Sequence, residues 1–285
     1  MSSQITTAFV EQYSANVSML SQQMGSKLRG AVDVETIRGK NAFFDQIGAT
    51  AAVARTTRHG NTPHSRRRVS LSDFEWADLI DDLDKVRMLV DPTSSYAKAA
   101  AAAMNRTIDD QIIAALGGAA DTGVAGGTSV ALPSSSKFST ASQTDGLTIA
   151  KLLETKFFFD NGSVDPSLKR YFVCGPKQIQ DLLNTTEVKS ADFNTIRALA
   201  QGEINSFLGF EFIMSTRLDF DATNTDDRLC FGFTEDAIKL AIGADVKAKI
   251  TERDDKSYAT QVYYSMAIGA TRMEEAKVFQ VPCDE

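Results

Sequence analysis

The sequence has few of the residues on which catalysis and metal binding most often depend. It contains two histidines, three cysteines and one tryptophan among 285 residues. The two histidines, His59 and His64, are five positions apart, and a metal bound there would need a third ligand. No set of a nucleophile, a base and an orienting acid can be recognised, so an enzyme is the least favoured class. We expect no catalytic residue, no cofactor and no metal site.

Long apolar segments and targeting signals are also missing. No run of about 18 apolar residues is present, so we expect no membrane-spanning helix and no membrane partner. The N-terminus lacks a basic start followed by an apolar block, which argues against a secretory signal. Cys174, Cys230 and Cys283 are far apart in sequence and form no CxxC pair. They favour a reducing compartment over a disulfide framework or a zinc site.

Two short segments have some features of a ligand site but do not meet its requirements. The glycine-rich segment 117–129 has no lysine for a phosphate-binding loop, which favours a flexible connector. The segment 219–230 has the first acidic positions of a calcium loop at Asp219 and Asp221. It has Asn224 where that loop needs glycine and Cys230 where it needs glutamate. We interpret it as a connection between strands.

What the sequence does contain is typical of a soluble globular protein. Hydrophobic residues make up 43% and charged residues 24% of the chain. The formal net charge is -7 and the isoelectric point is near 5.0, which argues against nucleic-acid binding by the whole surface. Any contact with nucleic acid would have to come from a local basic segment.

The first 76 residues predict elements that cannot be stable alone. An apolar stripe at helical spacing is too narrow to form a core, so it predicts an arm that packs on something else. Between Phe43 and Trp76 the pattern predicts two long strands around a turn containing Gly60, Asn61 and Pro63. Isolated hairpins are marginally stable in water, so this one needs a surface to lie on. The stripe of the arm consists of Phe9, Tyr13, Val17, Leu20 and Met24.

The rest of the chain reads as a long helix followed by a regular α/β pattern. Ser94 or Ser95 is a suitable N-cap for a helix from Tyr96 to Leu116, and two glycines end it. Residues 147–160 predict a helix, KRYFVCG a buried strand, and Pro176 the start of a short helix. FLGFEFIMS predicts another strand, and residues 245–282 predict two or three antiparallel strands. The inner side of the helix at 147–160 is predicted to carry Leu152, Leu153, Phe157 and Phe158.

Positive charge is concentrated in one segment of this acidic chain. Residues 54–70 (ARTTRHGNTPHSRRRVS) contain five arginines, and no acidic residue lies between Asp45 and Asp73. Six carboxylates follow with no basic residue among them. The arginines are Arg55, Arg58, Arg66, Arg67 and Arg68, and the carboxylates are Asp73, Glu75, Asp78, Asp81, Asp82 and Asp84.

The order of these segments resembles a known family. An arm, a basic hairpin, DFEWADLIDDLDKVRMLVDPTSSYAKAAAAAMNRTIDDQIIAAL, an α/β unit with GEINSFLGFEFIMSTRL, and closing strands follow one another. This order is similar to that of the major capsid proteins of tailed bacteriophages, which have the Hong Kong 97 fold, and it covers nearly the full chain. The most informative segments are RTIDDQIIAAL and residues 202–215.

The resemblance implies an α+β Hong Kong 97-like capsid fold. It implies an N-terminal arm at 1–45, an extended β-hairpin loop at 46–76, and an axial α/β domain at 146–244. The peripheral domain would comprise 77–145 and 245–285, with its long spine helix at Tyr96 to Leu116. The chain would assemble into pentamers and hexamers of an icosahedral shell around packaged double-stranded DNA, which it would contact without sequence specificity. The shell would form in the cytoplasm of the host bacterium and belong to the virion.

Two departures from the family pattern modify this expectation. Some relatives carry a scaffolding segment ahead of the arm, for which this chain has no room. A separate scaffolding protein is therefore expected, beside a portal protein and possible decoration proteins. Some relatives join neighbouring subunits covalently through a lysine of the extended loop. No lysine lies between Lys40 and Lys85, so we expect non-covalent contacts.

We expect the arginines of the loop to reach a neighbouring subunit and bind its acidic segment. The tip of a hairpin cannot easily fold back on its own root, and the arginine fork suits carboxylates. Three alternatives remain open. The arginines could contact the packaged DNA, as in a DNA-binding protein acting through the Arg55–Arg68 loop, or they could simply be solvated. The same fold could also form the shell of a cellular nanocompartment.

Overall fold

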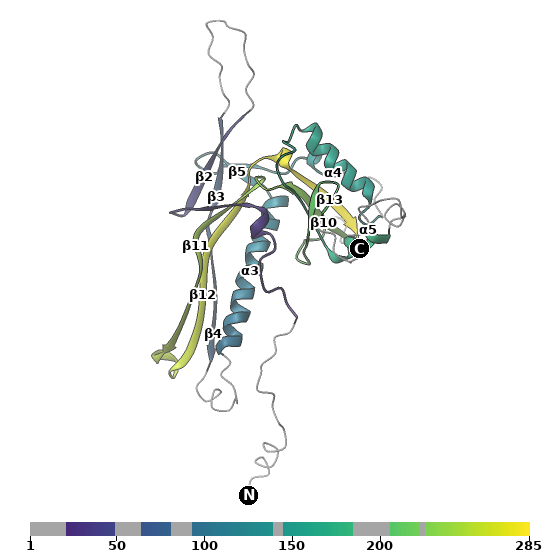
Figure 1. Ribbon diagram of the computed structural model, residues 1–285. Coiled ribbons are helices and arrows are strands. Elements are labelled where there is room, and N and C mark those ends of the chain that lie inside the picture. Colours follow the sequence, from purple (N-terminus) through teal and green to yellow (C-terminus); the bar gives the residue numbers. More distant parts are fainter. Residues whose placement is uncertain (1–20, 49–63, 81–92, 139–144, 185–205, 223–225) are drawn as a thin grey trace, which may run out of the picture. The chain divides into compact units, whose positions relative to one another are not determined.

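A computed structural model describes residues 21–48, 64–80, 93–138, 145–184, 206–222 and 226–285 (Figure 1). These residues form a mixed α+β fold, as the sequence predicts, and they divide into two compact units. The first unit comprises the described residues of 21–26, 73–80, 93–107 and 244–267. The second comprises 27–48, 64–72, 108–138, 145–184, 206–222, 226–243 and 268–285. Among the described helices, none has the length and apolar character needed to cross a membrane.

Strands outnumber helices in the described residues. The helices are α3 (Thr93–Gly117), α4 (Ile149–Asn161) and α5 (Pro176–Asn184), with 3-10 turns at Arg29–Ala31, Ser134–Ser136, Asp254–Lys256 and Glu275–Lys277. The strands are β1 (Asp33–Thr36), β2 (Asn41–Ile47), β3 (His64–Ser70), β4 (Ser72–Ile80), β5 (Ala120–Thr122), β6 (Thr128–Val130), β7 (Arg170–Cys174), β8 (Ser206–Phe207), β9 (Phe210–Met214), β10 (Asp227–Thr234), β11 (Ile238–Arg253), β12 (Ala259–Arg272) and β13 (Val278–Asp284).

The described strands form three sheets. Their strand orders are β1-β11-β12-β4, β2-β3-β5-β6 and β13-β10-β7-β9-β8. We call them the long-strand sheet, the hairpin sheet and the five-stranded sheet. The hairpin sheet and the five-stranded sheet lie in the second unit, whereas β4, β11 and β12 place most of their residues in the first.

The long helix predicted between Tyr96 and Leu116 is confirmed as α3. Its 25 residues correspond to a length of about 37 Å. The alanine run gives the strongest helix propensity available, and Ala100, Ala102 and Met104 are buried. At the C-terminal end, the Gly118 amide donates to the Ala114 carbonyl. The side chains of the two proposed N-cap serines lie outside the described residues.

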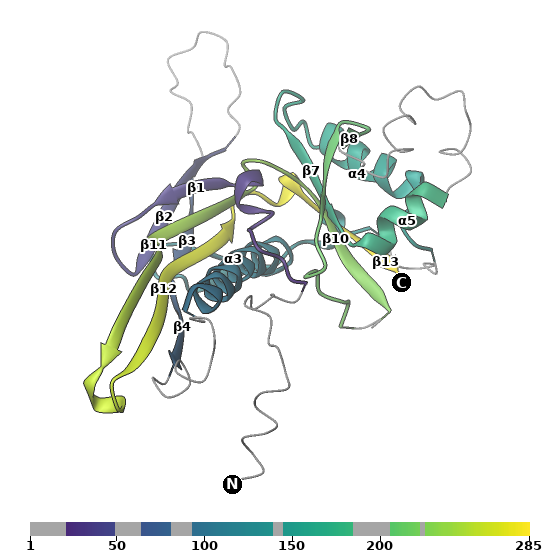
Figure 2. The same ribbon diagram turned by 60° about the horizontal axis from the view of Figure 1, so that its bottom comes forward.

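The five-stranded sheet is the most completely buried part of the second unit. All five residues of β7 are buried, as predicted for KRYFVCG. β7 pairs antiparallel with β10 and parallel with β9, and β10 pairs antiparallel with β13. Helix α4 packs on this sheet through Phe159, whose ring lies 6.0 Å from that of Phe210, and Phe158, whose ring lies 4.7 Å from that of Phe279 (Figure 2).

Two sequence predictions for this region need correction. Leu153 and Phe157 do not face inward: they are 49% and 67% exposed, and the buried face of α4 carries Lys151, Leu152, Thr155 and Phe159 instead. Lys151 is buried because its ammonium donates to two backbone carbonyls, so burial did not follow hydrophobicity alone. The segment FLGFEFIMS is also a tight hairpin, not one strand, with β8 and β9 joined at Leu208 and Gly209, which both have positive φ.

The structure brings together the three cysteines that are distant in sequence. Cys174, Cys230 and Cys283 lie on β7, β10 and β13, which are neighbours in the five-stranded sheet. All three are buried free thiols. Burial, with a smaller effect of Cys283, raises the pKa of Cys174 to about 12. A protonated, buried thiol is a poor nucleophile, so these side chains act as small core residues.

The predicted hairpin is present, but its predicted second strand is divided into β3 and β4, which belong to different sheets. β2 and β3 pair antiparallel, whereas β3 ends at Ser70 and β4 begins a new strand in the long-strand sheet. The chain changes sheets where Gly269 approaches the Ser70 carbonyl so closely that a Cβ on the glycine would lie 2.5 Å from it. The predicted turn at Gly60, Asn61 and Pro63 lies outside the described residues.

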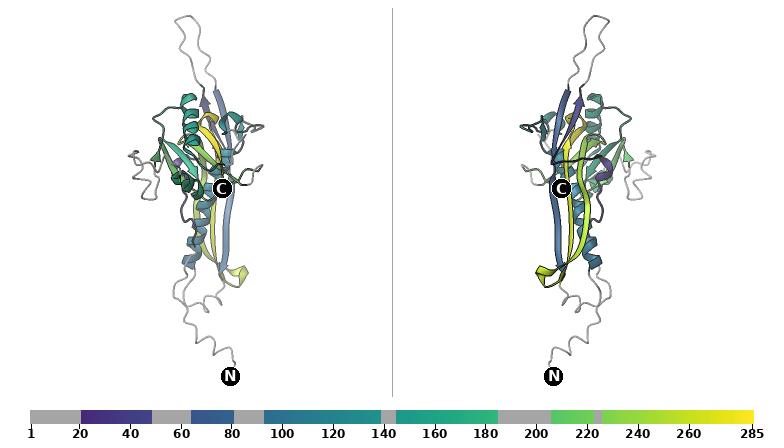
Figure 3. Two further views of the ribbon diagram at one scale, coloured as in Figure 1. Left: turned by 90° about the vertical axis from the view of Figure 1, so that its right-hand side faces the viewer. Right: turned by 90° about the vertical axis from the view of Figure 1, so that its left-hand side faces the viewer.

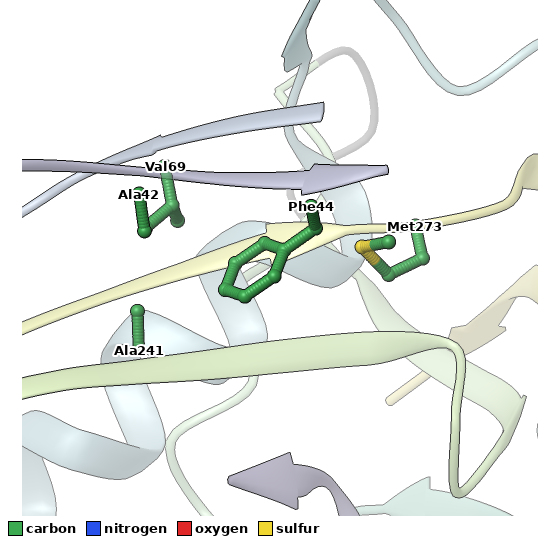
Figure 4. Packing of buried hydrophobic residues seen from close by; sticks show 5 residues of the cluster. All are labelled: Ala42, Phe44, Val69, Ala241 and Met273. Carbon is green, nitrogen blue, oxygen red and sulfur yellow. The ribbon is translucent and has the colours of Figure 1, made fainter. Parts of the chain in front are cut away.

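The base of the hairpin packs on its own chain. Ala42, Phe44 and Val69 point from β2 and β3 toward Ala241 of β11 and toward Met273, and all five are buried (Figure 4). The sequence predicted that the hairpin would need a surface to lie on. Part of that surface is supplied within the same subunit.

Candidate functional site

Arg66 forms an ion pair across the base of the hairpin. The register places it opposite Asp45, and its guanidinium donates to both carboxylate oxygens. This hydrogen bond lowers the pKa of Asp45 and raises that of Arg66. Both side chains are exposed, so solvent screens the pair and it contributes little to stability. Its exposed guanidinium also lies 5.7 Å from the ring of Phe43.

Arg67 is buried and binds within its own subunit. Its side chain is 9% exposed, and Nη2 donates to the two carboxylate oxygens of Glu275 at 2.6 and 2.9 Å. Its Nε donates to the Met273 carbonyl at 3.0 Å. A buried guanidinium with these partners fixes the base of the hairpin to the segment between β12 and β13. The structure therefore gives Arg67 a role inside the subunit.

Arg272 lies next to the same carboxylate. It is fully buried, and its Nε is 3.8 Å from Oε1 of Glu275. Its other nitrogens donate to the carbonyls of Leu116, Gly118 and Val130. Burial lowers the pKa of Arg272, and Glu275 opposes that effect. One carboxylate thus serves two buried guanidiniums, which links the hairpin base to the end of α3.

Arg68 also has a partner in its own chain. Its Nη1 donates to the Ala125 carbonyl in the connection between β5 and β6. Gly126 has φ of +64° there, and a side chain at that position would collide with the Arg68 guanidinium. The glycine-rich segment therefore allows the backbone to approach the arginine closely. It is a structural connection, in agreement with the absence of a phosphate-binding motif.

The remaining predicted residues lie on β4 or outside the described residues. Asp73 and Glu75 are exposed on β4, and Asp78 is half-buried there. Arg55 and Arg58 on one side of the proposed contact, and Asp81, Asp82 and Asp84 on the other, lie outside the described residues. Arg66, Arg67 and Arg68 lie in the second unit, whereas the described carboxylates of β4 lie in the first.

An acidic groove lies on β4 and β12 in the first unit. It has a volume of about 530 Å³ and is lined by Asp73, Phe74, Glu75, Ala244, Tyr263, Ser265, Met266 and Ala267. The Tyr263 hydroxyl donates to the Glu75 carboxylate at 2.9 Å, and this bond raises the pKa of Tyr263. The groove carries two exposed carboxylates and no basic residue, so a cationic side chain suits it.

Sequence reasoning missed the partners that hold the arginines. Asp45 could have been found, because once the hairpin register is known it stands directly opposite Arg66. Glu275 is 208 residues from Arg67, and no local pattern distinguishes it from other surface glutamates. Among the described residues, no group of three or more histidine, cysteine, aspartate or glutamate side chains could hold a metal ion.

The sequence matches the phage capsid protein family over residues 5–285. The chain therefore belongs to this family and is a structural protein of a virion capsid, not an enzyme. It is the major subunit of an icosahedral shell, so it associates with further copies of itself. The acidic and basic surfaces described above have to be considered in the context of that assembly.

Solved capsid structures share this fold across almost the whole chain. The capsid structure of cyanophage P-SCSP1u aligns with a TM-score of 0.73 and 18% identity, covering 97% of this chain and 93% of that one. Mycobacterium phage Che8 aligns with a TM-score of 0.71 and 17% identity, covering 95% and 96%. The capsid of Helicobacter pylori bacteriophage KHP30 aligns with 0.71 and 10%, covering 96% and 95%. The predicted Hong Kong 97-like fold is thereby confirmed. No curated protein matches the sequence.

Proposed function

We propose that this capsid protein forms the pentamers and hexamers of a shell that encloses double-stranded phage DNA. The observation that carries the proposal is the family match over residues 5–285 together with the capsid fold. The shell assembles in the host cytoplasm with a portal protein, a separate scaffolding protein and, in some forms, a decoration protein. The match to phage capsid proteins favours this function over a nanocompartment shell.

The domain organisation follows the capsid pattern. We assign 1–45 to the N-terminal arm, 46–76 to the extended loop, 77–145 and 245–285 to the peripheral domain, and 146–244 to the axial domain. The continuous helix α3 and the long strands β11 and β12 support the peripheral assignment, since they occupy the spine and the closing strands expected there. The completely buried β7 supports a separate axial core.

The contact between neighbouring subunits uses the arginine loop and the acidic groove. Arg66, Arg67 and Arg68 all donate to partners in their own chain, and Arg66 is the exposed one of the three. The contact therefore depends mainly on Arg55 and Arg58, with a contribution from Arg66. Asp73 and Glu75 in the groove of the neighbour accept them, with Asp78 and the carboxylates at 81, 82 and 84 close by in sequence. Each exposed pair contributes about 0–1 kcal/mol, and repetition over the shell makes the sum effective.

Charge reversal in the loop tests this contact. The double variant Arg55→Glu/Arg58→Glu is expected to fold as a subunit and fail to form shells in electron micrographs. Arg66 and Arg67 are poor choices for this test, because replacing them would also break their bonds to Asp45 and Glu275 within the subunit. Arg55→Lys/Arg58→Lys is the matched control, and Asp73→Lys/Glu75→Lys in the same chain should restore shells. Normal particles from the charge-reversed variant would refute the contact.

Direct binding of DNA by the same arginines is the competing interpretation. Affinity that falls steeply with salt would indicate that phosphates are neutralised and counterions released. A gel-shift assay of the unassembled protein at physiological salt distinguishes the two. We expect no shift, and a shift abolished by Arg55→Glu/Arg58→Glu would favour the DNA contact.

A further inference from the structure

The long-strand sheet ends in an open edge. β11 has β1 on one side and β12 on the other, but β1 has only four residues and pairs with Lys239–Ile242. The part of β11 that lies in the first unit, 244–253, has β12 on one side and none of the described strands on the other. We call residues 244–252 the β11 edge; Figure 2 shows it along the outer side of β11.

The direction of the free backbone groups can be worked out from two hydrogen bonds. The Ile242 carbonyl accepts from the Ile37 amide on the β1 side, so the backbone of residue 242 points away from β12. Backbone direction alternates along a strand, so the even-numbered residues of the β11 edge point the same way. The Val246 amide agrees, because it donates to the carboxylate of the preceding Asp245 and not to a strand.

Both faces of the β11 edge are also open to solvent. Ile250 is 51% exposed, and Lys247, Ala248, Lys249, Thr251 and Glu252 are exposed as well. A long strand with a free edge readily pairs with another chain, and proteins normally cover such an edge or blunt it with charge. Here the charges are Asp245, Lys247 and Lys249 on one face and Glu252 on the other, where Val246, Ala248 and Ile250 form an apolar stripe.

The opposite edge of the same sheet has a complementary character. β4 ends the strand order β1-β11-β12-β4 and has nine residues, the same number as the β11 edge. It carries the carboxylates of Asp73, Glu75 and Asp78 and no basic residue. On the β11 edge, the face with Lys247 and Lys249 also holds Asp245 and keeps a net positive charge. Opposite charges on adjacent strands stabilise pairing, and like charges disfavour it.

We propose that the β11 edge pairs with β4 of a second copy of this chain, so that the sheet continues from one subunit into the next. Such a contact joins two different surfaces, and repeated head-to-tail contacts close into rings when the rotation allows it. The inference rests on the proposed ring-shaped capsomers but does not depend on the arginine loop. Its hydrogen bonds are made by backbone groups of β4, which the arginine loop does not use, although both contacts draw on the carboxylates of Asp73 and Glu75.

Photo-cross-linking in assembled heads identifies the occupant. A photo-reactive amino acid is placed at Ile250, and the cross-linked peptides are identified by mass spectrometry. We expect adducts with residues 72–80 of another copy. Adducts with a different segment, adducts with another virion protein, or no adducts would each overturn the proposal.

A proline variant tests the backbone pairing itself. Ala248→Pro removes an amide that points away from β12, so the subunit should keep its circular dichroism spectrum while heads decrease at least tenfold. Ala248→Thr keeps the amide and should assemble normally. If Ala248→Pro does not fold, the cross-linking result decides. Normal heads from a folded Ala248→Pro variant would refute the edge pairing and leave the shell function intact, whereas a wild-type chain that forms no shells would refute the function.

Discussion

The five-stranded sheet and the long-strand sheet solve the problem of sheet edges in different ways. In the first, the edge strand β8 has only two residues, and the other edge strand, β13, is bridged at Gln280 by Lys137, with the Phe138 amide donating to the Gln280 carbonyl. In the second, β11 continues for eleven residues beyond the end of its pairing with β1, and most of these residues are exposed (Figure 3). The first sheet is finished within one chain. The second leaves the edge of β11 without a partner among the described strands, so a second subunit can complete it.

The largest effect of a single substitution is expected in the five-stranded sheet. Phe172 on β7 is fully buried and its ring contacts those of Phe210 and Phe212. Phe172→Ala should lower the free energy of unfolding of the free subunit by about 3–5 kcal/mol, because it removes apolar contacts and leaves a cavity. Urea denaturation followed by fluorescence measures the change. A loss below about 1 kcal/mol would show that this sheet is less well packed than the structure indicates.

The two ends of the β11–β12 pair provide the next test. Arg272 near the end of β12 is buried and donates to three backbone carbonyls. Arg272→Met should lower the free energy of unfolding by about 3 kcal/mol, because it leaves these carbonyls without donors. Arg253 at the end of β11 pairs with Asp255 in solvent. Arg253→Met is the matched control and should leave stability almost unchanged, because solvent screens this exposed pair. Equal effects of the two substitutions would remove the distinction.

A smaller, pH-dependent effect is expected at the end of the five-stranded sheet. Arg228 donates to both carboxylate oxygens of Glu285, and this bond lowers the pKa of Glu285 below its usual 4.5. A carboxylate with a lowered pKa in the folded state stabilises the fold above its unfolded pKa. That stability is lost as the pH falls through the lowered value.

The measurement compares wild type with Glu285→Gln in denaturation experiments between pH 7 and pH 3. Wild type should lose stability relative to the variant in the acidic part of this range, and the two curves should approach each other there. Parallel curves throughout would show that the Arg228–Glu285 pair contributes nothing.

The sequence predicted local elements well where a pattern repeated, and failed where partners came from afar. The alanine-rich spine helix and the buried KRYFVCG strand follow from propensity and hydrophobicity. The inner face of α4 was wrong at Leu153 and Phe157, because backbone carbonyls that satisfy Lys151 allow a polar residue to be buried in their place.

The candidate site shows the same limit. The charge blocks are visible in the sequence, but nothing there indicates that Arg67 is buried against Glu275 while Arg66 remains exposed beside Asp45. Successive residues of a strand point to opposite faces, so adjacent arginines must differ in environment. Which of them faces inward depends on the register, which distant contacts determine.

The smallest expected effect is at Ile250 on the β11 edge. Ile250→Ser should change the stability of the free subunit by less than about 0.5 kcal/mol, because the side chain is already half-exposed. If β4 of a second copy covers the edge, the same substitution removes an apolar contact repeated in every subunit. Heads should then lose their integrity at a lower temperature than wild-type heads, as scanning fluorimetry and electron microscopy can show. A weaker shell built from subunits of unchanged stability would show that the long-strand sheet, unlike the five-stranded sheet, is completed by assembly. Unchanged heads would mean that the β11 edge stays open in the virion.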